Sequence, residues 1–406
     1  MIHVARKGLV VSVSLALCLA AAACSSSGSS SSSSGSTSSS SAGTVPSISV
    51  GQLDRTFNAM ASLKPLAAAG KGSVAVILPD TVSSARYTEF DAPYLSQALA
   101  TAGLTPSQYS VVNAQGSDST ELSDAQEAIT KGASVLIMDP LDSGVGASIE
   151  SYAKSHGVAV IDYDRLTLGG SRADYVSFNN VAVGTLIGQG FVSCATAWKV
   201  SKPNVLVMKG APTDNNATLF AQGYNAVLAP LFANKSYTLV GTPAGTWDPP
   251  TAETEFQQQF TAHKNINSVV VPNDENAAPI IHYLQTQGVK ANTFPVTGQD
   301  ATLVGLQNIL SGFQCGTVYK PVYLEAQAAV AVAMYVRAGK TPPSSLVSGT
   351  TEDSQTSTAV PSVLLKPIWV TTSNMNSTVI ADQFVPPQQL CVGSFAAACK
   401  SAGISV

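Results

Sequence analysis

The first apolar run of the chain, Ser73–Asp80 with the sequence SVAVILPD, decides the fold. Its Val, Ile and Leu residues suit a buried strand, and Pro79 and Asp80 end the run before a longer, helix-like stretch begins. The same alternation of a short apolar run with a longer helical stretch continues through most of the chain. This pattern is typical of βα units, and it predicts an α/β fold with parallel sheets flanked by helices.

Nine segments fit the role of a strand in this pattern. The predicted strands are Ser73–Pro79, Gln108–Asn113, Ser134–Met138, Val158–Asp162, Asn204–Lys209, Tyr237–Gly241, Ser268–Val271, Pro295–Gly298 and Thr317–Tyr319. Each is a short run bounded by turn-forming or polar residues, which is the pattern expected of a β-strand.

Polar residues stand just beyond the carboxyl ends of six of these strands. They are Asp80, Asp139, Asp164, Asp214, Asn273 and Asp300. Any one of them is well explained as the N-cap of the following helix, because Asp and Asn are favoured there. Ligands of open α/β sheets bind at this same edge, so six such residues predict a shared binding surface between two facing sheets.

The composition of the chain indicates how many domains it forms and excludes nucleic acid as a partner. The chain has 406 residues, of which 45% are hydrophobic, and this is enough for about two domains with cores of their own. The 21 basic and 25 acidic residues give a formal net charge of −4, and no Lys/Arg block occurs after residue 7. Such a chain has no cluster of basic residues that could bind the phosphate backbone of a nucleic acid. We therefore expect no nucleic-acid partner.

Motifs of catalysis and cofactor binding are absent from the sequence. It contains no phosphate-binding P-loop, no zinc-protease HExxH, no GxSxG elbow and no strand-linked GxGxxG. Gly184, Gly188 and Gly190 fall inside a helix-like stretch instead, where they indicate close packing. We therefore predict no cofactor, no metal and no enzymatic activity.

The N-terminal segment carries a targeting signal. Arg6 and Lys7 precede the uncharged apolar stretch Gly8–Ala23, which is too short to span a bilayer and predicts a signal peptide over residues 1–23. Small residues before Cys24 resemble a bacterial lipoprotein processing site, which predicts an exported protein anchored by a lipid on Cys24 to the extracytoplasmic face of the cell membrane. An ordinary secreted protein cleaved nearby is the alternative.

A serine tract follows the lipidation site. Residues 25–41 consist of fourteen Ser, two Gly and one Thr, and such a segment has nothing to bury. We predict a disordered tether over residues 24–70 that holds the folded part away from the membrane surface.

Four cysteines remain in the exported region, namely Cys194, Cys315, Cys391 and Cys399. In an oxidising compartment they more often form two disulfides than a metal site, and three pairings are possible. The short loop from Cys391 to Cys399 favours that bridge, which leaves Cys194 for Cys315 if their segments are neighbours. Zinc is the weaker alternative, because the sequence offers no close ligand pairs.

Several strings are more specific than the alternating pattern. They are Ile161–Arg165 (IDYDR), Tyr175–Asn180 (YVSFNN), Gly210–Ala217 (GAPTDNNA), Pro272–Glu275 (PNDE), Gly298–Ala301 (GQDA) and Thr317–Pro321 (TVYKP). In this order and spacing, over about residues 73–367, the chain resembles the type I periplasmic sugar-binding proteins of ABC importers, and among them most the D-xylose-binding proteins.

The resemblance implies two similar α/β lobes, each with a parallel sheet flanked by helices, joined by three crossover strands. The N-terminal lobe would comprise residues 71–174 and 321–365, and the C-terminal lobe residues 175–320 and 366–406. A sugar would be held in the cleft between the lobes, where the carboxyl edges of both sheets meet.

The resemblance also implies a set of sugar-binding residues. Transferred residue by residue, it comprises Arg86, Tyr87, Asp139, Asp164, Arg165, Asn216, Trp247, Asn273, Asp300 and Lys320. These types suit a pyranose, whose C–H face stacks on aromatic rings while its hydroxyls give to carboxylates and accept from cations. As alternatives, Tyr87 and Trp247 could be packing aromatics, and Arg165 could form a surface ion pair with Asp164.

The implied function is that of an extracytoplasmic solute-binding lipoprotein. It would capture a monosaccharide, D-xylose or a related aldose, as a monomer and deliver it to the permease of an ABC importer. One alternative is a sugar receptor for a membrane sensor or chemotaxis system, and another is an exported carbohydrate-active enzyme using Asp164 and Asp300. A sugar-responsive repressor is excluded, because a signal peptide and a serine tract occupy the place of its helix-turn-helix.

Overall fold

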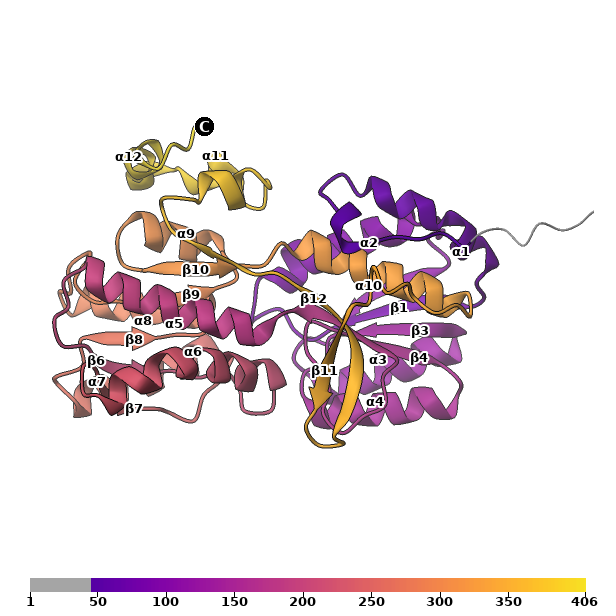
Figure 1. Cartoon of the computed structure of the whole chain (residues 1–406), viewed down its shortest axis with the longest axis horizontal. Helices are drawn as coiled ribbons and strands as arrows, with labels where there is room; N and C mark the ends of the chain where they lie inside the picture. Colours follow the sequence, from indigo (N-terminus) through magenta and orange to yellow (C-terminus); the bar gives the residue numbers. More distant parts are fainter. Residues whose placement is uncertain (1–44) are drawn as a thin grey trace, which may run out of the picture. The chain divides into compact units, whose positions relative to one another are not determined.

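The computed structural model describes residues 45–406, which fold into two α/β lobes (Figure 1). The predicted signal peptide, the lipidation site Cys24 and the serine tract lie outside the described residues. Within residues 45–406, no helix combines the length and the apolar character needed to cross a membrane.

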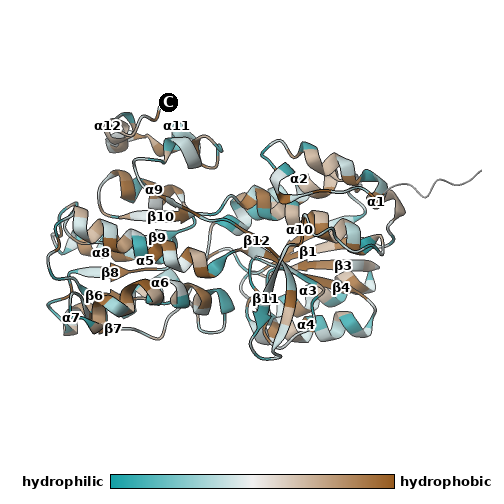
Figure 2. Cartoon of the chain, viewed as in Figure 1, coloured by the Kyte–Doolittle hydropathy of each residue, from teal (hydrophilic) through white to brown (hydrophobic). Residues whose placement is uncertain are grey.

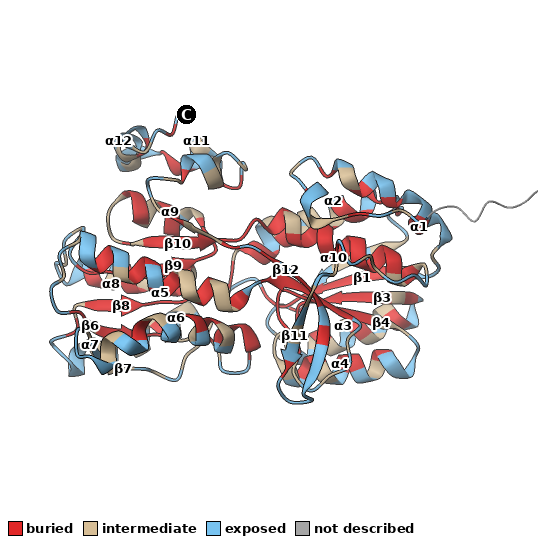
Figure 3. Ribbon diagram, viewed as in Figure 1, coloured by how far each residue is buried: buried red, intermediate tan, exposed pale blue. Residues whose placement is uncertain are grey.

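The first lobe is built on a seven-stranded sheet. Its strands are β1 (Ser73–Leu78), β2 (Tyr109–Asn113), β3 (Ala133–Met138), β4 (Ala159–Tyr163), β5 (Asp174–Phe178), β11 (Gly349–Asp353) and β12 (Thr358–Leu365). They follow the order β11-β12-β5-β4-β3-β1-β2, and all neighbours run parallel except β11 and β12. The central strands are apolar and buried on both faces, as Figures 2 and 3 show, because helices cover the sheet on each side.

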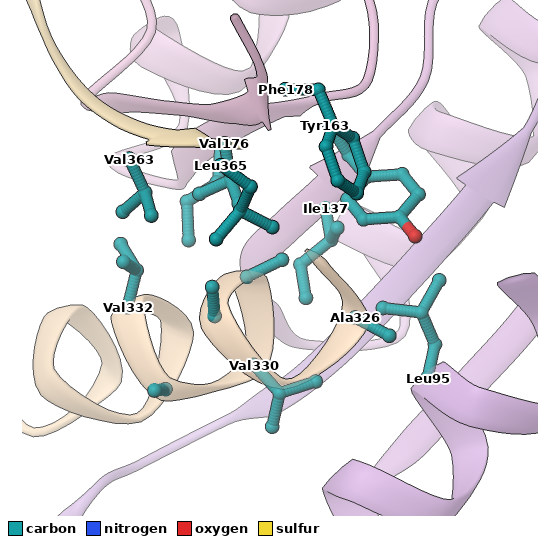
Figure 4. Close-up of a cluster of buried hydrophobic side chains, with 14 of the residues drawn as sticks. Leu95, Ile137, Tyr163, Val176, Phe178, Ala326, Val330, Val332, Val363 and Leu365 are labelled. Carbon is teal, nitrogen blue, oxygen red and sulfur yellow. The ribbon is translucent and has the colours of Figure 1, made fainter. Parts of the chain in front are cut away.

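One helix organises the core of this lobe. The helices are α1 (Lys64–Ala69), α2 (Ala92–Thr101), α3 (Asp118–Thr130), α4 (Ser143–Ser155) and α10 (Val322–Arg337), with a π-helix η3 (Tyr87–Asp91) before α2. Nearly all side chains of α10 are buried, and it packs on α2 and on β3, β4, β5 and β12. Figure 4 shows α10 contributing to one apolar cluster with these elements. A helix whose side chains are buried on all sides, Glu325 and Gln327 included, lies inside the core of the lobe.

The second lobe repeats the design with shorter strands. They are β6 (Asn204–Val207), β7 (Thr238–Gly241), β8 (Ser268–Val270), β9 (Thr297–Gln299), β10 (Gly316–Tyr319) and β13 (Ile368–Val370). Two three-stranded sheets, β7-β6-β8 and β9-β10-β13, are joined by a bridge between Val269 and Val296. The helices are α5 (Asn180–Ala197), α6 (Asn215–Ala233), α7 (Pro249–Ala262), α8 (Asp274–Thr286) and α9 (Leu303–Leu310).

Close packing explains the glycines of α5, as the sequence predicted. A Cβ atom on Gly184 would lie 2.0 Å from the carbonyl oxygen of Phe220 on α6, and one on Gly223 of α6 would lie 2.2 Å from that of Val181. The two helix backbones therefore touch directly, which any side chain at either position would prevent.

The predicted tether ends earlier than expected. Residues 50–69 form two 3-10 helices, η1 (Val50–Gln52) and η2 (Asn58–Leu63), and then α1. Ile48, Phe57 and Met60 are buried in the core of the first lobe, and Gln327 of α10 donates a hydrogen bond to the carbonyl of Asp54 (2.8 Å). The prediction of disorder is wrong for residues 45–70, because their apolar side chains find partners on α10, far away in the sequence.

The first crossover also lies later than the predicted boundary after residue 174. β5 spans Asp174–Phe178 and pairs with β4 and β12, so the first lobe continues to Phe178. The other crossovers fall between β10 and α10 and between β12 and β13. All nine predicted strands are present, whereas β5, β11, β12 and β13 were not predicted as strands.

The C-terminal segment completes the second lobe and reaches the first. It contains a π-helix η4 (Asn376–Ile380), α11 (Pro387–Leu390), a 3-10 helix η5 (Gly393–Phe395) and α12 (Ala396–Ser401). Phe384 stacks on Phe90 of η3, with ring centroids 3.8 Å apart. Both preferred disulfides are confirmed: Cys391 bonds to Cys399 within this segment, and Cys194 of α5 bonds to Cys315 just before β10.

Candidate ligand-binding site

Side chains from both lobes line one cavity at the carboxyl ends of the strands. It holds about 320 Å³ of space free of protein atoms, a volume that includes solvent at its open side. The lining residues are Ser83, Ser84, Arg86, Tyr87, Asp164, Arg165, Asp214, Asn216, Phe220, Trp247, Asn273, Gln299, Asp300 and Lys320. Nine of the ten predicted site residues are among them, and the exception is Asp139.

Four of the six predicted polar edge residues line the cavity, and they are of two kinds. Asp214 and Asn273 are N-caps, since their side chains accept hydrogen bonds from backbone N–H groups in the first turns of α6 and α8. Asp164 and Asp300 do not precede a helix in this way, and both adopt positive φ angles, 56° and 96°. Such conformations are rare for residues other than glycine and recur at functional sites, where they aim a side chain.

A buried arginine fixes the carboxylate of Asp164. Arg86 donates to Asp164 (2.9 Å), to both carboxylate oxygens of Asp91 (2.8 Å each) and to Glu325 of α10 (2.6 Å). The guanidinium is 2% exposed, so water does not screen its contacts with these carboxyl groups. Burial raises the pKa of Glu325 to about 8, although the charge of Arg86 acts against this shift.

Lys320 connects the two lobes. It lies at the second crossover, with Nζ 3.6 Å from a carboxylate oxygen of Asp164 in the first lobe and 3.2 Å from one of Asp300 in the second. Burial by itself would lower the pKa of Lys320, but the two carboxylates raise it. Burial likewise favours a high pKa for Asp164, but Arg86 and Lys320 outweigh it and lower that pKa to about 2. Asp164 is therefore an ionised acceptor at neutral pH.

Arg165 forms a second charged cluster with other partners. It donates to the Tyr87 hydroxyl (3.0 Å) and to two backbone carbonyls of the loop after β3, and its Nε lies 3.4 Å from Asp214 and 3.7 Å from Asp139. Asp139 thus stands behind Arg165 rather than at the cavity wall, and burial raises its pKa well above the usual range. Asp164 and Arg165 are both buried and have different partners, so the alternative of a surface ion pair between them is wrong.

Two aromatic side chains, one from each lobe, contribute to the lining. Tyr87 is buried in the first lobe between Arg86 and Arg165, whose guanidinium carbons lie 5.7 and 5.6 Å from its ring centroid. Trp247 of the second lobe is half-buried and donates from its indole nitrogen to Asp214 (2.9 Å). Either ring thus presents a fixed apolar surface to the cavity, since its polar group is held by the protein.

The backbone leaves room for Trp247 at Gly210. A Cβ atom on Gly210 would lie 2.1 Å from the indole ring, so only glycine permits this placement. Phe220 of α6 packs edge-on against the same ring, with the centroids 6.4 Å apart. The orientation of the indole is therefore determined from both sides.

The two asparagines of the site are already engaged by the protein. Asn216 donates from its amide to the carbonyl of Asp164 (3.0 Å) and accepts from Asn180 (2.8 Å). Asn273 donates to the carbonyl of Ser83 (3.2 Å), a residue of the first lobe. Both residues line the cavity, and both also form hydrogen bonds from the second lobe to the first.

Five lining residues were not in the predicted set. They are Ser83, Ser84, Asp214, Phe220 and Gln299. The sequence held a signal for two of them, since Asp214 stands at a strand end and Gln299 precedes Asp300. Phe220 gives no such signal, because its place depends on how α6 is rotated against α5.

The cavity therefore offers carboxyl oxygens as acceptors, guanidinium and ammonium donors, and aromatic faces. Among residues 45–406, no group of three or more His, Cys, Asp or Glu side chains is arranged to hold a metal ion. This arrangement can hold a small polar ligand with an apolar face through hydrogen bonds and stacking.

Comparisons with known proteins agree with this geometry. Residues 74–341 match the periplasmic binding protein domain. The D-xylose-binding periplasmic protein of Escherichia coli (strain K12) is 34% identical over 284 residues, which are 69% of this chain and 82% of that protein. Its counterpart in Haemophilus influenzae is 36% identical over 278 residues, 68% and 80% of the two chains.

A solved structure shows the same fold. A carbohydrate transporter solute-binding protein from Chloroflexus aurantiacus, in complex with D-glucose, aligns with a TM-score of 0.70 and 26% identity. The alignment covers 78% of this chain and 97% of the other. These relatives are binding proteins rather than enzymes, which agrees with the sequence-based expectation. The chain belongs to the periplasmic binding protein family.

Proposed function

We propose that the protein captures a monosaccharide, D-xylose or a related aldose, in this cavity and delivers it to the permease of an ABC importer. The observation that carries the proposal is the convergence of Asp164, Arg86 and Lys320 with Trp247 in a cavity that both lobes line. Relatives named for D-xylose binding and a similar structure holding D-glucose support a sugar as the ligand class.

The residue chemistry matches a pyranose. The carboxylates of Asp164 and Asp300 can accept hydrogen bonds from sugar hydroxyls, and the cations of Arg86 and Lys320 can donate to the same hydroxyls. The indole of Trp247 offers an apolar face for the C–H groups of the ring. Because these groups are fixed by protein contacts before a ligand arrives, little side-chain ordering remains to oppose binding.

The mechanism is hinge closure without a covalent step. Three chain segments join the lobes, so a rotation about them can open the cavity and close it again. A sugar that contacts residues of both lobes stabilises the closed arrangement relative to the open one and shifts the equilibrium between them. The closed surface is then the form that a permease recognises.

The alternative of a carbohydrate-active enzyme fits the site less well. A glycosidase needs one carboxylic acid that holds its proton near neutral pH, and this requires a raised pKa. Lys320 pairs with both Asp164 and Asp300, and the pKa of Asp164 is lowered to about 2. Incubation with a free sugar or a glycoside should accordingly leave the sugar unchanged, and release of product would contradict the proposal.

The membrane anchor is a separate part of the proposal. A lipid on Cys24 would keep the protein at the extracytoplasmic face, close to its permease. Replacing Cys24 by Ala should then move the protein from the membrane fraction to the soluble exported fraction. Copurification of the wild-type protein with a permease would support delivery, whereas copurification with a sensor kinase would favour the receptor alternative.

Titration calorimetry on the purified protein tests the ligand class. D-xylose, D-ribose, D-glucose, D-galactose, L-arabinose and myo-inositol form the panel, and we expect tight binding of one aldose. Asp164→Ala and Trp247→Ala should each weaken that binding by at least about tenfold, because a charged hydrogen bond or a stacked ring is lost. Glu127→Gln, on the exposed face of α3, is the matched control and should bind as the wild type does.

A further inference from the structure

The lobes also meet outside the cavity lining, at Glu275. This residue lies in the first turn of α8 in the second lobe, and its side chain faces the loop between β1 and η3 in the first. One carboxylate oxygen accepts from the backbone N–H of Ala85 (2.9 Å) and from the hydroxyl of Ser84 (3.1 Å). Glu275 is not among the residues that line the cavity.

The loop that Glu275 binds is held in place from within the first lobe. The carboxylate of Asp80 accepts from the backbone N–H groups of Val82 and Ser83, and Asn113 donates to the carbonyl of Asp80 (2.8 Å). The loop therefore moves with its lobe, and a rotation of the lobes separates it from α8 as a unit.

Neighbouring groups direct the Glu275 carboxylate toward this loop. Its second oxygen accepts from the amide of Asn273 (3.2 Å), and Asn273 in turn donates to the carbonyl of Ser83 (3.2 Å). The hydroxyl of Ser84 also lies 3.2 Å from a carboxylate oxygen of Asp300. Burial, together with the nearby Asp300 and Asp274, raises the pKa of Glu275.

The contact bears directly on Arg86. Ala85, whose N–H group Glu275 binds, immediately precedes Arg86 in the chain, and Arg86 holds Asp164 at the cavity. The hydrogen bond that Ala85 donates to Glu275 of α8 thus ties the second lobe to the backbone that carries a cavity cation. It can form only while the lobes are closed.

We propose that Glu275 is a positioning residue that latches the closed state, so that it slows release of the ligand without touching it. This inference rests on the proposed capture of a sugar between the lobes. The latch acts after closure, whereas the ligand enters the open form. It should therefore control the dissociation rate constant and leave the association rate constant unchanged.

Stopped-flow kinetics with the sugar bound by the wild-type protein test the latch. Glu275→Ala should speed dissociation at least about tenfold, because a buried acceptor is removed from two donors, and should change the association rate by less than about twofold. Glu275→Gln keeps an oxygen that can accept from Ala85, so its dissociation rate should stay near that of the wild type. Glu253→Ala on α7 of the same lobe, whose carboxylate accepts from Gln257 within its own helix, is the matched control.

A second measurement does not need a sugar. Spin labels on cysteines introduced at the exposed Thr130 of α3 and Thr261 of α7 report the distance between the lobes. In the Glu275→Ala background the short-distance, closed population should fall relative to the wild type, with and without ligand. An unchanged closed population together with unchanged dissociation overturns the latch. Absence of sugar binding by the wild-type protein overturns the proposed function instead, and the spin-label distances still decide the latch.

Discussion

Two buried arginines of the first lobe, Arg86 and Arg172, each face three carboxylates, yet only Arg86 lines a cavity. Arg172 lies in the loop between β4 and β5, and its side chain is 1% exposed. Its charged partners are Glu150 of α4 (3.5 Å), Asp162 of β4 (3.9 Å) and Asp353 of β11 (2.9 Å). A buried arginine with three carboxylates thus lines the cavity in one place and links elements of the same lobe in another.

Backbone groups form hydrogen bonds with the charged side chains of the Arg172 cluster. Asp162 accepts from the N–H of Thr167 (2.7 Å), and Asp353 accepts from the N–H of Gly169. Arg172 itself donates to the carbonyl of Thr167 (2.7 Å). These bonds fasten the β11–β12 hairpin to the loop that follows Arg165, so this cluster supports the shape of the site from behind.

The two clusters differ in their balance of charge. Around Asp164 the cations Arg86 and Lys320 outweigh the effect of burial, and the pKa falls to about 2. In the Arg172 cluster burial dominates, and the pKa values of both Glu150 and Asp162 are raised. Asp164, which lines the cavity, is kept ionised by two cations, whereas Glu150 and Asp162 of the Arg172 cluster more readily hold a proton.

The largest effect is expected from breaking the Arg86 cluster. Arg86→Met leaves Asp91, Asp164 and Glu325 buried without their shared cation, which should lower the free energy of unfolding by about 3–5 kcal/mol. Sugar affinity should fall by at least about a hundredfold, because a donor and the orientation of Asp164 are lost together. Urea unfolding and calorimetry measure the two effects, and wild-type affinity in this variant would contradict the site.

Arg172→Met is the matched variant in the other cluster. It removes the cation that Glu150 and Asp353 share, so we expect a loss of about 3 kcal/mol in the free energy of unfolding. Because Arg172 does not line the cavity, the folded protein should keep its sugar affinity within about threefold. A hundredfold loss of affinity would show that the two clusters are not separable.

Glu325 of the Arg86 cluster should make the free energy of unfolding depend on pH. Its pKa of about 8 in the folded protein exceeds the value of about 4.3 expected when unfolded, so the folded state binds more protons between these limits. Stability should fall as the pH rises from about 5 to 8, by at most about 1.4 kcal/mol per pH unit for this one group. Glu325→Gln should reduce that slope, and unfolding at several pH values measures it.

Asp164 contributes in the opposite direction. Its lowered pKa stabilises the folded state at pH values above about 4, and this contribution is lost as the pH falls toward 2.

An unchanged slope between pH 5 and 8 in Glu325→Gln would assign the pH dependence to other buried acids, such as Glu121 and Asp274, whose pKa values are raised to about 8 and 7.

The smallest effect is expected from Asp353, the partner of Arg172 on β11. Asp353→Asn keeps one oxygen that can accept from backbone N–H groups but loses the negative charge opposite Arg172. The free energy of unfolding should fall by about 1–2 kcal/mol, with sugar affinity unchanged. Thermal unfolding with and without ligand measures both, and a larger loss than in Arg172→Met would contradict the assigned partners.

The strands that could be predicted share one property. Each of the nine is a short apolar run ended by polar or turn-forming residues, and this pattern needs no knowledge of distant neighbours. β12 has an alternating and partly polar pattern, and β5, with the sequence DYVSF, mixes an acidic residue and a serine with its apolar residues. The tether prediction failed similarly, because Ile48 and Phe57 become core residues only once α10 lies beside them.

The sequence by itself determined the alternating α/β plan, the polar edge of the strands, the disulfide candidates and most side chains of the cavity. The first three follow from local patterns, whereas the cavity side chains were transferred from the resemblance to the type I sugar-binding proteins. Only the tertiary structure decided which charges pair: Arg86 meets Glu325 across 239 residues, and Glu275 meets Ser84 across 191. Such contacts depend on the rotation of helices and the closure of lobes, which are determined by packing of the whole core rather than by any local stretch.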